Sequence, residues 1–221
     1  MNFNVVIATP STGMCKSMYA YSLANLVAYF SQVRIYPEDH SQSLEILMLE
    51  GSGISSNREK MVIDALAKKD MTHLLFIDED MGFNKEALHQ LARRRLPIVG
   101  CNYRMRVPPA EFTALNMERT KRIETHVNVS GLEECYYMGF GFCLIAREVL
   151  EATEAPRFPI FYKPEMQGYT TEDLPFFVQA REKGFKSYVD HDTSKIIWHN
   201  GSISYTWNED YTELNKNLSQ R

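Results

Sequence analysis

An apolar run that stops abruptly at three acids limits the possible folds of this chain more than any other stretch. Residues 74–77 read Leu-Leu-Phe-Ile, without alternating polar side chains. Such a run is typical of a strand covered on both faces, as in the middle of a parallel sheet. Asp78, Glu79 and Asp80 follow directly. Because open parallel sheets bind ligands beyond the carboxyl ends of their strands, these acids mark the expected position of chemistry.

The three acids allow two interpretations. In an extended chain, Asp78 and Asp80 would project to one side and Glu79 to the other. Two close carboxylates repel each other, and a divalent cation that also binds substrate phosphates relieves that repulsion. Alternatively, the acids form a solvated turn that favours the positive start of the next helix, which we predict at residues 84–95. The acids alone do not decide between the two.

Composition and charge narrow the class of protein. The chain has 221 residues and a net charge of -4, which argues against broad non-specific nucleic-acid binding. We expect one domain over residues 1–207 and a polar tail over residues 208–221. The chain contains no apolar run of membrane-spanning length, and its N-terminus does not resemble a signal peptide. The four cysteines form no close pair and no zinc-type spacing, so we expect free thiols in a cytoplasmic protein.

Strand and helix signals alternate through the first half of the chain. The predicted strands are 2–8, 44–49, 74–77 and 96–101, and the predicted helices are 16–30, 54–68 and 84–95. This alternation predicts an α/β fold with a mostly parallel central sheet flanked by helices. In the second half, short β-leaning pieces predict a small antiparallel addition, followed by two helices and a last strand pair. These segments are residues 112–117, 126–129, 135–138, 146–153, 173–183, 186–189 and 195–198.

Two helix starts carry charged residues that allow both a structural and a functional interpretation. Ser56 and Glu59 have capping-box spacing, but Arg58 between them opposes the helix dipole and is better placed to clamp a phosphate. The second helix must begin near Pro175, which is tolerated only in a first turn. There Asp173 is either a capping residue or a catalytic acid, and capping is favoured locally.

Three further segments keep their alternatives open. Gly139 and Gly141 flank an aromatic residue, which is typical either of a tight backbone crossing or of a site floor that a sugar approaches closely. The basic residues 93–95 are the normal complement of a helix C-terminus. Arg104 and Arg106 lie in a basic and aromatic loop that can face a substrate.

Together, these motifs resemble the GT-A-type nucleotide-sugar glycosyltransferases, including small soluble bacterial and phage enzymes. The resemblance rests on motifs that occur in the family's order and together extend over nearly the whole chain. They are Asn57-Arg58, Asp78-Glu79-Asp80 after a buried strand, Glu172-Asp173 at a helix start, and His199 after a late strand. The resemblance implies a GT-A-like fold related to the Rossmann fold.

The resemblance also implies a donor site. Asp80 and His199 would ligate a divalent metal that bridges the donor's diphosphate, and Asp78 would contact the metal or the ribose. Because imidazole suits transition ions, Mn²⁺ is expected before Mg²⁺. The implied donor-binding residues are Thr9, Pro10, Arg58, Asp78 and Glu79, with a UDP-sugar as the favoured donor. Glu79 is the middle residue of the acidic motif and does not point to an acceptor class.

For catalysis, the resemblance implies that Asp173 is the general base of an inverting transfer to an acceptor hydroxyl. Glu172 would contact the acceptor or orient Asp173. A retaining mechanism, in which the donor phosphate assists the hydroxyl, stays open. The acceptor is a glycan, a small molecule or a modified DNA base, and the acidic net charge lowers the odds of DNA.

Two other functions compete with the transferase. A sugar nucleotidylyltransferase shares a related fold and metal-phosphate chemistry, but the chain has no glycine-rich phosphate loop after its first strand. A non-catalytic nucleotide- or sugar-binding protein of the same fold would not need Asp173 as a base.

Overall fold

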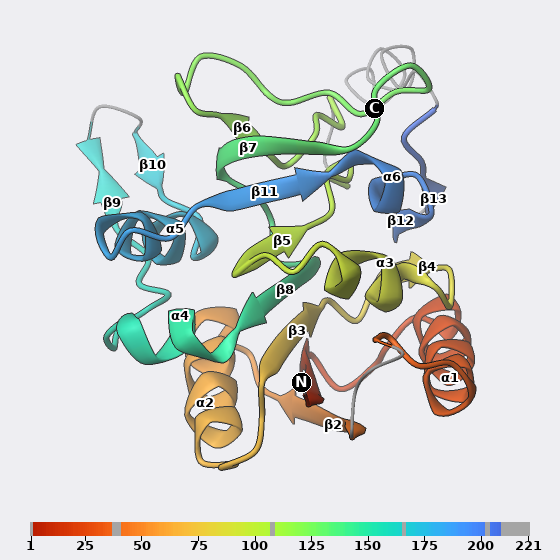
Figure 1. The fold of residues 1–221 in the computed structure, drawn as a ribbon. Coiled ribbons are helices and arrows are strands. Elements are labelled where there is room, and N and C mark those ends of the chain that lie inside the picture. Colours follow the sequence, from red (N-terminus) through yellow and green to blue (C-terminus); the bar gives the residue numbers. More distant parts are fainter. Residues whose placement is uncertain (1, 37–40, 107–108, 165–166, 202–203, 209–221) are drawn as a thin grey trace.

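The fold is built on one large mixed sheet. The computed structural model describes residues 2–36, 41–106, 109–164, 167–201 and 204–208. The sheet has eight strands in the order β2-β1-β3-β8-β5-β11-β7-β6 (Figure 1). These strands are β1 (Phe3–Ser11), β2 (Gln42–Glu50), β3 (His73–Ile77), β5 (Ile98–Gly100), β6 (Leu115–Asn116), β7 (Leu132–Tyr137), β8 (Phe142–Ala146) and β11 (Ser187–Asp190).

The direction of the strands confirms the mostly parallel sheet and its antiparallel addition. β1 pairs in parallel with both β2 and β3, and β5 pairs in parallel with β11. β7 runs antiparallel to β11 and β6, at the edge that the second half of the chain builds. The predicted strand at residues 126–129 does not form; these residues lie in a turn-rich connection.

Helices cover both faces of the sheet, as the uninterrupted apolar run of β3 predicts. Leu74 and Phe76 pack into the core on one face, and Leu75 and Ile77 pack into the core on the other. Figure 1 shows α2, α4 and α5 on one side and α1, α3 and α6 on the other. The helices are α1 (Ser17–Gln32), α2 (Ile54–Leu66), α3 (Ala87–Arg93), α4 (Arg147–Ala152), α5 (Asp173–Glu182) and α6 (His191–Ser194).

One strand takes a position that the sequence does not predict. β8 inserts between β3 and β5 and runs antiparallel to both, so residues 142–146 cross the centre of the sheet. Its side chains are apolar on both faces, like those of its parallel neighbours. Apolar patterning therefore indicates a central strand here, but it does not encode direction.

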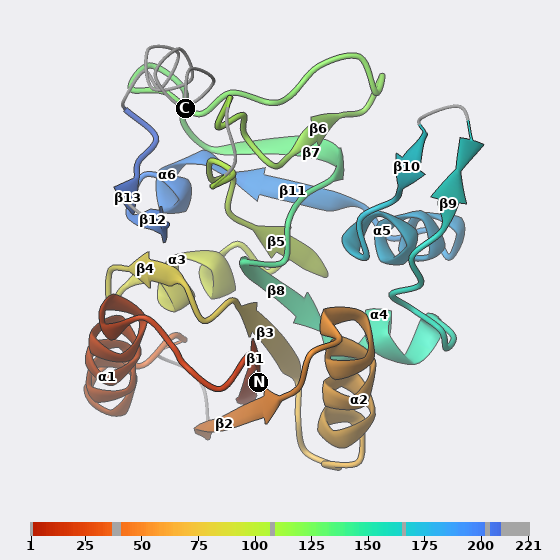
Figure 2. The same ribbon diagram turned by 180° about the vertical axis from the view of Figure 1, so that it is seen from behind.

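Two small sheets complete the described part of the architecture. β12 (Ile197–Asn200) lies between β4 (Met81–Phe83) and β13 (Ser204–Tyr205), antiparallel to each. β9 (Tyr162–Lys163) and β10 (Gly168–Tyr169) form a two-stranded ribbon next to α5, which Figure 2 shows from behind. The pairing of β4 with β12 matters most for the site, because it brings residues near position 80 beside residues near position 199.

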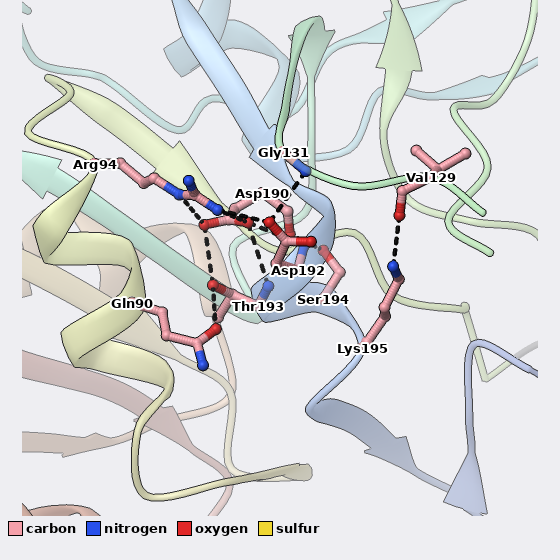
Figure 3. A network of polar contacts seen from close by, with 9 residues as sticks. All are labelled: Gln90, Arg94, Val129, Gly131, Asp190, Asp192, Thr193, Ser194 and Lys195. Atoms are coloured by element: carbon pink, nitrogen blue, oxygen red, sulfur yellow. Dashed lines mark hydrogen bonds and ion pairs between the residues drawn. The ribbon is translucent and has the colours of Figure 1, made fainter. Parts of the chain in front are cut away.

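A second set of acids at the carboxyl end of a strand has a structural role. Asp190 ends β11, is fully buried, and receives two hydrogen bonds from Arg94, at 2.8 and 3.1 Å (Figure 3). Arg94 also donates to Asp192 at 2.9 Å. The arginine therefore does more than complement the end of α3: it neutralises two acids and ties α3 to α6.

The remaining sequence expectations concern cysteines, membranes and the tail. All four cysteines are free, and three of them are buried, which confirms the predicted thiols. Within the described residues, no helix is both long and apolar enough to cross a membrane. Most of the predicted tail at 208–221 lies outside the described residues, so its separation from a domain at 1–207 stays a prediction.

Candidate functional site

The three acids after β3 lie in a tight turn that leads into β4. The backbone N–H of Met81 donates to the carbonyl of Asp78 at 3.0 Å, so the chain is not extended there and the condition for the two-sided alternation is not met. Instead, the three acids contact different partners but line a single pocket of about 220 Å³. Its lining is Pro10, Ser11, Thr12, Gly51, Ser52, Ile54, Asn57, Asp78, Glu79, Asp80, Arg106 and His199.

Glu79 is held by the end of the first strand. Its carboxylate accepts hydrogen bonds from the hydroxyls of Ser11 and Thr12, each at 2.6 Å, and from the backbone N–H of Thr12 at 3.1 Å. The predicted end of the first strand at residue 8 is wrong, because β1 continues to Ser11. As a result Thr9 is fully buried, with its hydroxyl 2.5 Å from that of Tyr19, whereas Pro10 lines the pocket. Donor contacts by Thr9, Pro10 and Glu79 stay predictions.

Asp80 and His199 come together through the pairing of β4 with β12. Asn200 secures this arrangement by donating its backbone N–H and side-chain amide to the carbonyl of Asp80, at 2.8 and 3.0 Å. His199 Nε2 then lies 3.3 Å from Asp80 Oδ2. His199 Nδ1 donates to the carbonyl of Arg104 at 2.9 Å. This hydrogen bond fixes the ring so that Nε2 faces the carboxylate.

The surroundings of the Asp80 carboxylate lower its pKa. Burial by itself would raise its pKa, but the hydrogen bond and charge of His199 and the charge of Arg106 outweigh burial, so the pKa is lowered. Arg106 Nη1 lies 2.8 Å from Asp80 Oδ2. The other oxygen, Oδ1, is buried and has no hydrogen-bond partner among the described residues. The lowered pKa favours the ionised form of Asp80, and its Oδ1 atom is available to a ligand.

These features fit a divalent cation. An unpartnered buried carboxylate oxygen beside an imidazole whose other nitrogen is anchored to a carbonyl is the ligand and outer-shell pattern of metal sites. The described residues contain no group of three His, Cys, Asp or Glu side chains positioned to hold a metal. The predicted trio is therefore only partly assembled: Asp80 and His199 meet, while Asp78 contacts Arg58. Metal ligation by the three residues stays a prediction.

Arg58 is buried and is not among the residues that line the pocket. It is only 2% exposed, and its Nη2 lies 3.0 Å from Asp78 Oδ1 and 3.3 Å from Glu172 Oε1. The rings of Phe76 and Phe140 lie about 5 Å from its Cζ. The guanidinium therefore joins the acid after β3 to the acid before α5. Its predicted phosphate contact stays a prediction, since its charge is directed at two carboxylates.

Glu172 and Asp173 stand at the start of α5. Burial raises the pKa of Asp173 to about 6, and the charge of Glu172 adds to this, whereas Thr171 and Arg58 oppose it. Asp173 Oδ1 is buried and has no hydrogen-bond partner within the described residues. A carboxylate with a raised pKa and a free oxygen is suited to accept a proton near neutral pH.

The two capping interpretations are wrong. α2 begins at Ile54 with Gly53 as its N-cap, so Ser56 lies inside the helix, where its hydroxyl donates back to the carbonyl of Gly53 at 2.8 Å. α5 has Glu172 as its N-cap, and the side chain of Glu172 makes no capping hydrogen bond to a described residue. Asp173 is the first helical residue. Helix capping therefore does not account for these acids.

The two glycines before β8 allow a tight crossing over Tyr103. The Tyr103 hydroxyl accepts a hydrogen bond from the backbone N–H of Gly141 at 2.8 Å. A Cβ at Gly139 or Gly141 would lie within 2.5 Å of that hydroxyl, which is far too close. Tyr103 also packs edge-on against the ring of His199, with centroids 5.4 Å apart. Gly139 and Gly141 thus make room for a side chain that supports His199, which favours the structural alternative.

Sequence reasoning did not assign a site role to Arg106, Tyr103 or Asn200. Tyr103 and Arg106 belong to the basic and aromatic loop that was noted as substrate-facing, so a signal for them exists. Asn200 directly follows His199, but its role depends on the pairing of β4 with β12, which the sequence does not reveal.

Solved structures of low sequence identity share this fold. A197 from STIV superposes with a TM-score of 0.62 at 18% sequence identity, covering 94% of this chain and 95% of that chain. S. aureus TarS 1-349 in complex with UDP-GlcNAc gives a TM-score of 0.51 at 12% identity, covering 96% of this chain and 61% of that chain. No family model matches the chain, and no curated protein matches its sequence. At these identities, the likeness shows the fold, which is α/β and GT-A-like.

Proposed function

We propose that this protein transfers a sugar from a nucleotide-diphosphate sugar, with a UDP-sugar favoured, to an acceptor hydroxyl. The observation that carries the proposal is one chain of contacts across the site. Asp78, in the pocket, pairs with Arg58, which pairs with Glu172, which directly precedes Asp173. These contacts support a general base at Asp173 that works together with a donor bound in the pocket, as transfer between a donor and an acceptor requires.

The donor half of the proposal assigns the diphosphate to the pocket. Asp80 and His199 are the residues that would hold a divalent metal, with Asp78 as a further candidate at the same turn. Such an ion, Mn²⁺ before Mg²⁺, would neutralise the charge of the departing diphosphate. The TarS structure with UDP-GlcNAc supports a UDP-sugar donor for this fold. The chain spans less than two thirds of that TarS fragment, so nothing of its wider function is carried over.

The acceptor half of the proposal assigns proton transfer to Asp173. The acceptor oxygen forms a bond to the anomeric carbon as the bond from that carbon to the diphosphate oxygen breaks. The hydroxyl proton passes to Asp173, and the nucleoside diphosphate leaves. Attack from the face opposite the leaving group inverts the anomeric centre. Glu172, which lies 3.3 Å from Arg58, is the neighbour of the base and holds the start of α5 against that arginine.

We expect slow, metal-dependent release of UDP when the protein is incubated with a UDP-sugar and Mn²⁺, because water can replace the acceptor. The released UDP or GDP is quantified by coupled assay over a panel of UDP- and GDP-sugars, with and without EDTA. Asp70→Asn, at an exposed aspartate, serves as the matched control for Asp80→Asn, which should lose the metal-dependent rate.

Each alternative predicts a different result in this assay. Turnover that requires added pyrophosphate would indicate a nucleotidylyltransferase. Tight nucleotide binding without turnover would indicate a binding protein. Either result would contradict the transferase.

A further inference from the structure

Arg106 is the cationic side chain of the pocket. Among the described residues that line the pocket there are three acids and one arginine or lysine, which is Arg106. Its side chain is 50% exposed, whereas that of Asp80 is 10% exposed. The guanidinium thus reaches from the solvent side of the pocket to a nearly buried carboxylate. This position differs from that of Arg58, which is buried and does not line the pocket.

Arg106 contacts the same carboxylate, that of Asp80, that would bind the proposed metal. Asp80 Oδ2 lies 2.8 Å from Arg106 Nη1 and 3.3 Å from His199 Nε2. A divalent ion bound by Asp80 and His199 would carry two positive charges to within a few ångströms of the guanidinium. Like charges at such a distance repel strongly at a partly buried site. Without compensating negative charge, the two cations therefore compete.

A nucleoside diphosphate supplies that compensating charge. Its phosphate oxygens can bind a metal and a guanidinium at once, and the planar fork of arginine matches their geometry. We propose that Arg106 binds the donor's diphosphate and is the alternative counter-ion to the metal at Asp80, so that the pocket takes a nucleoside diphosphate even without a metal. This inference rests on the proposed function and names the residue that recognises the donor.

The geometry favours this role over a purely structural ion pair. An exposed arginine contributes little stability through a single ion pair. Here Arg106 pairs with Asp80, which is the acid of the turn that also contacts His199. Even so, Asp80 Oδ1 has no hydrogen-bond partner among the described residues. An arginine that only stabilised the fold would not need to occupy the wall of the pocket.

The test compares wild type, Arg106→Ala and the control Arg34→Ala. Arg34 is exposed and lies near the start of β2, at the opposite end of that strand from the pocket. Two affinities are measured: Mn²⁺ without nucleotide, by electron paramagnetic resonance of free Mn²⁺, and UDP in EDTA, by calorimetry. In Arg106→Ala we expect Mn²⁺ to bind about tenfold more tightly and UDP about tenfold more weakly, the scale of one charge-assisted hydrogen bond. Arg34→Ala should match wild type in both.

The outcomes separate this inference from the function on which it rests. If wild type binds UDP and Mn²⁺ but either affinity of Arg106→Ala stays within twofold of wild type, the role of Arg106 is overturned and the transferase stands. If wild type binds neither ligand, alone or combined, the proposed function fails and this inference fails with it. Circular dichroism of each variant confirms that a lost affinity does not reflect unfolding.

Discussion

Replacing Asp173 by Asn is expected to lower sugar transfer by roughly 10²- to 10⁴-fold, the usual contribution of a general base. Asn keeps the size of the side chain but cannot take the acceptor proton. Because Asp173 lies at the start of α5 and does not line the donor pocket, UDP affinity should change little. The measurement is kcat for transfer together with the Kd of UDP. Asp70→Asn, at an exposed aspartate, is the matched control. Near-full turnover in Asp173→Asn would show that the base lies elsewhere or that transfer is retaining.

The pH profile gives the same prediction an independent readout. The pKa of Asp173 is raised to about 6, mainly by burial, so the wild-type rate should fall about tenfold per pH unit below 6.

The effect of Asp173 on stability should have the opposite pH dependence from its effect on the rate. The pKa of Asp173 is higher in the folded protein than in the unfolded chain, so protonation of Asp173 stabilises the folded protein. This stabilisation is fully present below about pH 4 and is lost as the pH rises through 6. Asp173→Asn should therefore raise the melting temperature at pH 8 and not at pH 4. An unchanged melting temperature at pH 8 would contradict the assigned environment.

The second large effect concerns stability. Arg58→Met is expected to lower the free energy of unfolding by about 3–5 kcal/mol, the cost of removing one partner from a buried charge cluster. Methionine fills most of the space between Phe76 and Phe140, but it leaves the carboxylates of Asp78 and Glu172 without their cation. Urea denaturation measures the change, and Arg34→Met is the control at an exposed site.

A compensating variant separates lost charge from lost packing. If charge is the cause, adding Asp78→Asn and Glu172→Gln to Arg58→Met should recover part of the stability, because the unpaired charges are then removed. If Arg58→Met differed from wild type by less than about 1 kcal/mol, the net contribution of this cluster would be no larger than that of an exposed ion pair.

The sequence predicts the architecture better than it predicts the site. The run at 74–77 predicts a strand buried on both faces because double-sided burial leaves a direct apolar signal. β8 carries the same signal, yet its antiparallel insertion depends on how the chain returns to the sheet, which no local pattern records. Likewise, the first strand was predicted to end at residue 8, but β1 continues to Ser11. Pro10 fits this strand because, among the described residues, the pairing of β1 with β3 ends at Ala8, which leaves one side of β1 unpaired there.

The site shows where motif spacing stops being informative. The contact between Asp80 and His199 follows from the pairing of β4 with β12, two short strands far apart in sequence. The sequence singles out Arg58 as a cation that opposes the helix dipole, but only the packing reveals that it is buried and contacts two carboxylates. Arg106 lies in a loop whose basic character is visible in the sequence, whereas its target is not.

The central claim is that the pocket at Asp80 and His199 holds the diphosphate of a nucleotide donor together with a divalent cation. The most direct test is anomalous diffraction at the manganese edge from crystals grown with UDP and Mn²⁺. The account predicts a manganese peak at bonding distance from the Asp80 carboxylate and His199 Nε2, in contact with the diphosphate. A peak on other side chains, or UDP bound away from this pocket, would contradict it.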